Sequence, residues 1–274
     1  MKRFSSDSTH WYTSAGQPMH TVIGANGKAR SATLADARKQ DLLPSVTNIL
    51  GVVNKPALTE WKMQQAVLSA LTLPRLDGEG TDAFADRVVA DALEYTGAAA
   101  EFGTKMHEAC ELVLTSQLAG WEREVEAWLP YLLLWVGARV KTVHWVEQQV
   151  VSVGGGYAGT ADALVVDNDG RVLLVDFKTQ GIKPGKVAVF YPEWCAQIAA
   201  YAAALRFGWP DLGCCNVVID SRNPGVFVER IWTGDEVRAG EAAFRAAATL
   251  WRWQKGYDPR GPGWADGGIL NHEP

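Results

Sequence analysis

The second half of the chain carries the pattern of apolar and polar positions that is typical of β-strands. Two apolar runs, residues 163–166 and 172–175, flank the turn sequence Asp167-Asn168-Asp169-Gly170, and this arrangement predicts a β-hairpin. Three further runs bring the expected number of strands to about five: residues 141–153, 215–219 and 226–232. The second half of the chain is therefore predicted to form a β-sheet.

The first half of the chain instead shows the periodicity and the boundary residues of helices. Ser45 is placed to cap one helix, Pro56 to open the next, and Thr81 or Asp82 to cap a third through Tyr95, after which residues 97–117 continue the helical run. Helices are expected over residues 33–40, 46–53, 57–71, 81–95, 97–117 and 121–139. In the last of these, tryptophans spaced by seven predict packing against the core: Trp121, Trp128 and Trp135.

Both ends of the chain add smaller elements. Trp11-Tyr12 and Thr21-Val22-Ile23 flank glycine and Asn-Gly signals, which predict a small hairpin. Thr233 and Glu236 form a capping box for a closing helix over residues 237–254. The expected organisation is an N-terminal extension (1–42), a helical lobe (43–139), a core (140–254) and a loosely ordered tail (255–274) rich in Gly and Pro.

Composition and charge narrow the class of protein. The 274 residues are 47% hydrophobic, enough for a sizeable core, and the net charge of -5 argues against binding of nucleic acid by bulk charge. A local basic groove stays compatible with that charge. The four cysteines form no Cys-x-x-Cys pair, and no secretory signal or run of about 18 apolar residues is visible. We therefore expect a soluble, intracellular protein without a membrane partner.

The predicted hairpin carries acidic residues on both arms. Asp162 precedes the first apolar run, and Asp176 and Lys178 follow the second. Because side chains alternate along a strand, Asp176 and Lys178 point the same way, whereas Phe177 points into the opposite layer. Downstream, Gln197 and Tyr201 share one helix face at spacing i, i+4. These side chains are expected to converge.

Two carboxylates on adjacent strands are suited to a hard, exchangeable cation such as Mg²⁺ or Mn²⁺. A cation there activates water and stabilises charge on a phosphoryl group, and Lys178 would assist, so phosphodiester hydrolysis is the indicated chemistry. His107, in a helix of small residues, is the candidate to complete the metal site. Glu111, one turn later, and Glu147, in the strand before the hairpin, are weaker candidates.

These residues together resemble a known family. Gly103-Thr104-x-x-His107-x-x-x-Glu111, Gly159-Thr160-Ala161-Asp162, Asp176-Phe177-Lys178-Thr179 and Gln197-x-x-x-Tyr201 follow the order and spacing of the PD-(D/E)XK nucleases of the RecB type. The resemblance implies an α/β (α+β) fold with a restriction-endonuclease-like core, in which helices flank a mixed β-sheet.

The resemblance also assigns roles to the residues. His107, Asp162, Asp176 and the backbone carbonyl of Phe177 would bind Mg²⁺ or Mn²⁺, as one ion or two. Lys178 would be catalytic, with His107 and the two aspartates. Three residues would support the site and contact DNA: Thr179, Gln197 and Tyr201.

A second resemblance covers the N-terminal part of the lobe. Leu43-Pro44-Ser45-Val46-Thr47-Asn48-Ile49-Leu50 followed by Leu58-x-x-Trp61-Lys62 is similar to a block in phage-encoded stand-alone nucleases and in the mitochondrial genome maintenance exonuclease. It implies that Ser45 and Thr47 lie near bound single-stranded DNA. The Cas4 and AddB branches hold an iron–sulfur cluster with flanking cysteines that this chain lacks, so no cluster is expected.

The expected function is a metal-dependent DNA exonuclease that acts on single-stranded ends in recombination, repair or phage replication. A structure-specific endonuclease of the same fold and a non-catalytic DNA-binding module are the alternatives. Expected partners are single-stranded DNA and a recombinase, annealing or single-strand-binding protein, in a bacterial cytoplasm with a phage or prophage source. Several side chains are candidates for a DNA groove: Lys55, Lys62, Lys183, Lys186 and Arg206, with Trp61 or Tyr191 stacking on bases.

Overall fold

The computed structural model describes residues 10–117, 120–209 and 211–261. Its centre is a five-stranded sheet in the order β5-β6-β7-β8-β9. The strands are β5 (Val140–Ser152), β6 (Tyr157–Asp167), β7 (Val172–Gln180), β8 (Gly213–Asp220) and β9 (Phe227–Trp232). Neighbours pair antiparallel except β7 and β8, which are parallel and are connected through α6 (Pro192–Leu205). The sheet is therefore mixed, and the expected hairpin is its β6–β7 pair.

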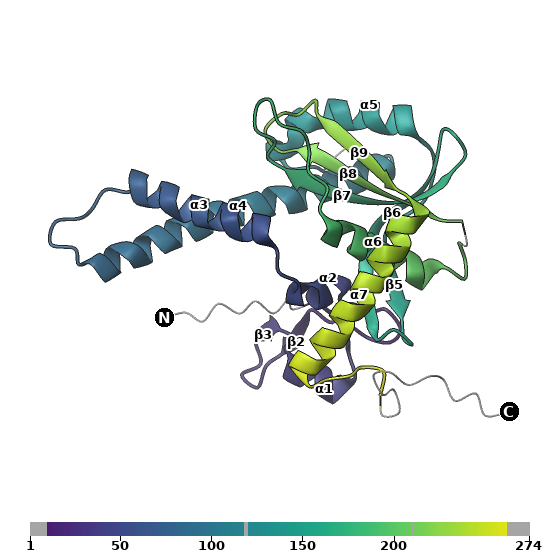
Figure 1. Cartoon of the computed structure of the whole chain (residues 1–274), viewed down its shortest axis with the longest axis horizontal. Coiled ribbons are helices and arrows are strands. Elements are labelled where there is room, and N and C mark those ends of the chain that lie inside the picture. The colour runs from purple at the N-terminus through teal and green to yellow at the C-terminus, as the bar shows by residue number, and fades with distance from the viewer. Residues whose placement is uncertain (1–9, 118–119, 210, 262–274) are drawn as a thin grey trace.

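Helices cover both faces of this sheet (Figure 1). Alternation along β7 assigns the faces, because Leu174 packs with α6 and α7 (Gly234–Lys255), whereas Val175 and Phe177 pack with α4 (Thr81–Leu114) and α5 (Leu129–Arg139). All four cysteines are buried in these two layers. The expectation of an α/β fold with a mixed sheet flanked by helices is confirmed.

Helix α3 (Pro56–Thr72) and the N-terminal part of α4 project from the body as a two-helix arm, residues 56–100 (Figure 1). The predicted helical run over residues 81–117 is a single helix, because α4 is continuous over 34 residues, or about 51 Å. A single glycine, Gly97, costs a helix only about 1 kcal/mol, and packing elsewhere along α4 offsets that. The predicted cap is wrong, since Gly80 is the N-cap residue.

The predicted helix over residues 121–139 begins later than expected. Residues Arg123–Trp128 form a 3₁₀ helix, and α5 starts at Leu129 with Pro130 in its first turn. Proline has no N–H to donate and suits the first turn of a helix, so it sets the boundary. The interpretation of the tryptophans is confirmed, because all three pack against the buried cluster beneath α4 and α5: Trp121, Trp128 and Trp135.

The N-terminal residues form two small sheets. β2 (Thr21–Ile23) and β3 (Ala29–Ser31) make a hairpin, whereas β1 (Trp11–Tyr12) pairs with β4 (Leu43–Pro44). Trp11 was predicted to flank the hairpin but is not part of it, because its ring packs against Trp251 of α7. Helices α1 (Leu34–Gln40) and α2 (Val46–Ile49) and the 3₁₀ turn Leu50–Val52 follow.

The ends of the helices explain their boundaries. Ser45 caps α2 by accepting the N–H of Asn48, and Thr233 and Glu236 form the predicted capping box, with α7 starting at Gly234. Of the predicted tail, residues 262–274 lie outside the described residues. Within the described ranges, no helix combines the length and the apolar character that a membrane span requires.

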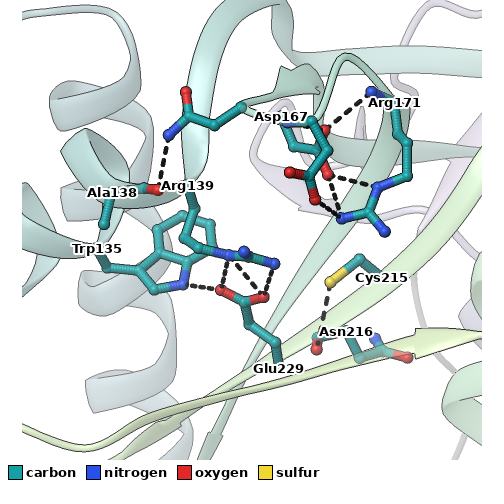
Figure 2. Close-up of polar contacts among 10 residues, drawn as sticks. Trp135, Ala138, Arg139, Asp167, Arg171, Cys215, Asn216 and Glu229 are labelled. Atoms are coloured by element: carbon teal, nitrogen blue, oxygen red, sulfur yellow. Dashed lines mark hydrogen bonds and ion pairs between the residues drawn. The ribbon is translucent and has the colours of Figure 1, made fainter.

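Glu229 of β9 fastens α5 to the sheet (Figure 2). Its carboxylate accepts from the Trp135 indole N–H at 2.6 Å and from the Arg139 guanidinium at 2.6–2.9 Å. The Asn168 side chain, in the turn of the β6–β7 hairpin, donates to the carbonyl of Ala138 at 2.7 Å. The C-terminal end of α5 is thus bonded to a strand and to the hairpin turn.

We predict that Glu229→Ala lowers the free energy of unfolding by about 1–3 kcal/mol, because it removes a charged hydrogen-bond partner from Trp135 and Arg139. Chemical denaturation with urea measures the change. The matched control is Asp235→Ala, whose ion pair with Arg238 is exposed on α7 and should contribute nothing measurable. Equal effects of the two substitutions would contradict the prediction.

Candidate active site

The pairing between β6 and β7 ends where the two strands carry their acidic residues. The ladder runs from Val166–Val172 to Ala163–Val175, and the next residues along the strands are Asp162 and Asp176. Asp162 Oδ2 accepts the backbone N–H of Phe177 at 2.7 Å. A side chain thus takes the place of the strand partner, so the strands separate without leaving that N–H unpaired. We call the site at this separation the fork.

Helix α4 brings His107 to the fork. His107 Nδ1 lies 3.3 Å from Asp162 Oδ2. The helix approaches β7 closely, because a Cβ atom at Gly103 would lie only 3.2 Å from Thr179 Oγ1. One turn of helix separates Gly103 from His107, so the glycine sets how deeply the imidazole reaches.

Glu147 joins the same cluster from β5. Ligand atoms of His107, Glu147 and Asp162 lie within 4.8 Å of one another. Glu147 has φ +48°, a left-handed conformation that is rare for a residue with a side chain and costs on the order of 1–3 kcal/mol. It sits between the paired residues of two regular rungs, Val146–Ala163 and Gln148–Ala161. The irregular backbone aims this carboxylate at the fork.

Asp176 is held differently. It is 1% exposed, and three side chains donate to its carboxylate. Lys178 Nζ lies 2.7 Å from Oδ2, Asn216 Nδ2 lies 2.6 Å from Oδ2, and Gln197 Nε2 lies 3.2 Å from Oδ1. Gln197 Oε1 also accepts from Lys178 at 3.2 Å. Lys178 is therefore fixed by both Asp176 and Gln197.

Asn216 is a member of this network that was not among the predicted site residues. It is fully buried in β8, and its side-chain carbonyl accepts from the Trp232 indole N–H of β9 at 2.7 Å. Trp232 thereby sets the amide so that its NH₂ group faces Asp176. A polar residue inside the apolar run of β8 was the available signal, because a buried amide requires partners.

Tyr201 completes the wall of the site from α6. Gln197 Nε2 lies 3.5 Å from the Tyr201 hydroxyl. The Tyr201 ring lies directly over Gly159, where a Cβ atom would be 2.7 Å from Cε1 of the ring. This contact is the physical reason for the glycine that begins Gly159-Thr160-Ala161-Asp162.

The carboxylates of the site repel one another. Burial, together with the nearby charges of Asp162, Glu111 and Asp176, raises the pKa of Glu147 to about 7. Burial also raises the pKa of Asp176 to about 6, against the opposing effect of the Lys178 ammonium. Several carboxylates are thus crowded into a site where their charged forms are disfavoured. A bound cation would relieve this repulsion.

The donor set fits a divalent metal ion. Carboxylate oxygens of Glu147 and Asp162 with the imidazole of His107 are ligands that such an ion accepts. The order and the proximity of these groups, on β5, β6 and α4, place them on one side of the fork. Asp176 and Lys178 occupy the other side.

The remaining predicted residues lie around this centre. Glu111 is exposed on α4, one turn after His107, and the Phe177 ring is buried edge-on against His107. Ser45 and Thr47 bond to each other, and Ser45 bridges to Ala158 of β6, four residues before Asp162. Most of the other predicted residues line one groove next to the fork: Lys55, Trp61, Thr179, Lys183, Lys186 and Tyr191. Two predicted groove residues do not line it, namely Lys62 and Arg206, and Arg206 pairs with Glu241 instead.

Comparison with known families adds to this geometry. Residues 63–255 match the sequence profile of the PD-(D/E)XK nuclease superfamily. The matched range covers more than half of the chain and includes His107, Glu147, Asp162, Asp176 and Lys178. No curated protein shows a significant sequence match to this chain.

We predict that Glu147→Gln alters how stability depends on pH. The folded pKa of about 7 exceeds the unfolded value of 4.5, so the native wild type loses stability as pH rises from about 4.5 to 7. The free energy of unfolding of Glu147→Gln should therefore rise relative to that of the wild type as the pH increases from about 4.5 to 7. The gain should be about 1–2 kcal/mol, less than the full shift implies, since solvent screens a half-exposed carboxylate.

Thermal unfolding in EDTA at pH 5 and pH 8 measures this difference. Glu108→Gln, an exposed position on α4 next to His107, serves as the control and should show no pH-dependent gain. Adding Mn²⁺ at pH 8 should stabilise the wild type more than Glu147→Gln. An identical pH profile for the wild type and Glu147→Gln would contradict the assignment of Glu147 to the cluster.

Proposed function

Because the chain belongs to the PD-(D/E)XK nuclease superfamily, we propose that it is a metal-dependent DNA exonuclease that hydrolyses phosphodiester bonds at single-stranded ends. Cleavage of nucleic acid with a divalent metal is the activity that the family match supports. The observation that carries the proposal is the fork, where His107, Glu147 and Asp162 face Asp176 and Lys178.

The residues of the fork have distinct tasks in this proposal. His107, Glu147 and Asp162 would hold the metal ion, with Asp176 and the Phe177 backbone carbonyl as further ligands. When bound, Mg²⁺ or Mn²⁺ lowers the pKa of a coordinated water and stabilises negative charge on the phosphoryl group. The present donor set permits one ion or two.

Lys178 provides the second charge at the reacting phosphate. Its ammonium group is oriented by Asp176 and Gln197 and can donate to the attacking water or to a phosphate oxygen. Asn216 and Trp232 hold Asp176 in the orientation that this requires. Since Lys178 is fixed before substrate binds, little reorganisation is needed as charge develops.

The finer parts of the proposal rest on the order of the motifs, which resembles the RecB type and its phage-encoded and mitochondrial members. On that basis we place the protein in recombination, repair or phage replication, in a bacterial cytoplasm and beside a recombinase, annealing or single-strand-binding protein. We assign the cleavage chemistry to residues 140–254 together with His107, which the helical lobe (residues 43–139) contributes, and we assign the choice of strand to that lobe. A catalytically inactive module would have no use for a charged cluster that is costly to bury without a metal.

The decisive experiment compares end-labelled linear single-stranded DNA with closed circular single-stranded DNA of the same sequence. With Mg²⁺ or Mn²⁺, the linear form should be degraded to short products while the circle stays intact, and EDTA should abolish cleavage. Cleavage of both forms would favour an endonuclease of the same fold. Cleavage that persists in EDTA would refute the metal dependence.

We predict that Asp176→Asn and Lys178→Ala each lower the rate of cleavage by about 100-fold or more. Lys178→Ala removes the cation aimed at the reacting phosphate, and Asp176→Asn removes the carboxylate that orients Lys178 and would help to hold the metal ion. Two matched substitutions in the same sheet control for general effects: Asp169→Asn in the hairpin turn and Lys141→Ala on β5, both at exposed positions. Circular dichroism shows that the variants are folded. If Asp176→Asn and Lys178→Ala cut as fast as the wild type, the site is assigned wrongly.

A further inference from the structure

A groove with a volume of about 560 Å³ begins next to the fork. Its floor includes Thr179 and Gln180, the residues that follow Lys178 in β7. One wall is the base of the arm, with the first turns of α3 and the middle of α4, and the other is the segment 181–189 that leads to α6. A ligand in this groove would therefore lie beside the part of β7 that directly follows Lys178.

The groove concentrates positive charge in a chain whose net charge is -5. Four cations line it, from three separate segments: Lys55, Lys183, Lys186 and Arg222. A single acidic residue, Glu193, accompanies them. Most arginines elsewhere pair with carboxylates, as Arg139 does with Glu229, but none of the four groove cations forms an ion pair with the described residues. Unpaired cations are available to neutralise phosphates.

The segment that carries Lys183 and Lys186 is anchored on both sides. The side-chain amide of Gln180 accepts the backbone N–H of Val189 at 2.9 Å and donates to the Val189 carbonyl at 3.3 Å. The N–H of Ile182 donates to Asp220 Oδ1 at 3.0 Å. Because the backbone is fixed at its two ends, the two lysines are presented at the groove with a reduced entropic cost of binding.

Aromatic side chains alternate with these cations. Trp61 and Tyr95 extend from the arm, and Tyr191 and Trp194 lie on the opposite wall, edge to face with ring centroids 4.9 Å apart. Tyr95 is 56% exposed, which is unusual for a large apolar ring without a partner. Aromatic rings beside cations are the features by which proteins hold unpaired nucleic acid strands.

A double helix does not suit these walls. Stacking on an aromatic ring requires a base with a free face, and in a duplex the neighbouring base pairs cover those faces. The volume falls in the range of clefts that enclose ligands of small-molecule size, with room for about one or two nucleotides. The groove thus selects an unpaired strand by shape and by stacking, without reading its sequence.

We infer that this groove is the track along which single-stranded DNA approaches the fork. Lys55, Lys183, Lys186 and Arg222 neutralise its phosphates, while Trp61 and Tyr95 stack on its bases. The inference rests on the proposed function and names the substrate-binding surface of the same site.

The experiment measures binding separately from cleavage, by fluorescence anisotropy of a labelled thymidine oligomer in EDTA over a range of salt concentrations. In the double variant Lys183→Ala/Lys186→Ala, log K against log salt should become shallower by about 1.4, at about 0.7 for each lost phosphate contact on a single strand. Lys28→Ala/Lys39→Ala, which removes two exposed lysines outside the groove, should leave the slope unchanged.

Tyr95→Ala tests stacking. It should weaken binding of the single strand by about 5- to 150-fold, the range for loss of one stacked base, with the salt slope unchanged. Tyr131→Ala, a tyrosine of similar exposure on α5, should bind like the wild type. A duplex of equal length should bind more weakly and should not respond to Tyr95→Ala.

The outcomes separate this inference from the proposed function. Unchanged affinity and slope in the groove variants, or a duplex bound as tightly as the single strand, would overturn the track even if the protein cleaves DNA. If the groove variants change binding as predicted but no DNA is cleaved in Mg²⁺ or Mn²⁺, the inferred DNA track is supported and the proposed exonuclease activity is overturned. With active protein, the groove variants should raise KM for linear single strands and leave kcat near the wild-type value.

Discussion

The hydrogen bond from the Phe177 N–H to the Asp162 carboxylate is the contact on which the geometry of the site depends. A buried N–H that loses its strand partner costs free energy comparable to a lost hydrogen bond, so two paired strands do not separate spontaneously. Here a side chain supplies the missing acceptor. The separation of β6 and β7 is thereby stabilised, and it opens the edge of the sheet toward His107 on α4 and Lys178 on β7. The same carboxylate that shapes the fork also belongs to the His107, Glu147 and Asp162 cluster, which could hold a metal ion.

The two aspartates of the hairpin have different surroundings, although the sequence presents them as a pair. Asp176 is enclosed by donors, with Lys178, Gln197 and Asn216 around its carboxylate. Asp162 instead faces an imidazole and a second carboxylate whose pKa is raised. On one side of the fork the Asp176 carboxylate is surrounded by donors and fixes the Lys178 ammonium group. On the other side, two carboxylates lie beside one imidazole, which leaves negative charge that a cation would neutralise.

How far the sequence predicts this site depends on how local each signal is. Strand alternation and helical spacing act over a few residues, so the hairpin, the Asp162, Asp176 and Lys178 set and the Gln197–Tyr201 face could be predicted. Glu147 could only be a weak candidate, because its side chain is aimed by a positive φ that no alternation pattern encodes. Asn216 depends on Trp232 of a neighbouring strand. The helical run continues through Gly97 because the low helix propensity of one glycine is a weak local effect that packing over the whole helix overrides.

Helix α4 connects the two parts of the proposed substrate path. Its C-terminal half is packed on the sheet and carries His107, whereas its N-terminal half belongs to the arm and carries Tyr95. The two side chains are 12 positions apart in one unbroken helix, or about 18 Å along its axis. Because the helix is continuous, a strand held against Tyr95 would have a fixed relation to His107 at the fork. The long helix thus carries one residue of the proposed strand-binding groove and one proposed metal ligand on a single rigid element.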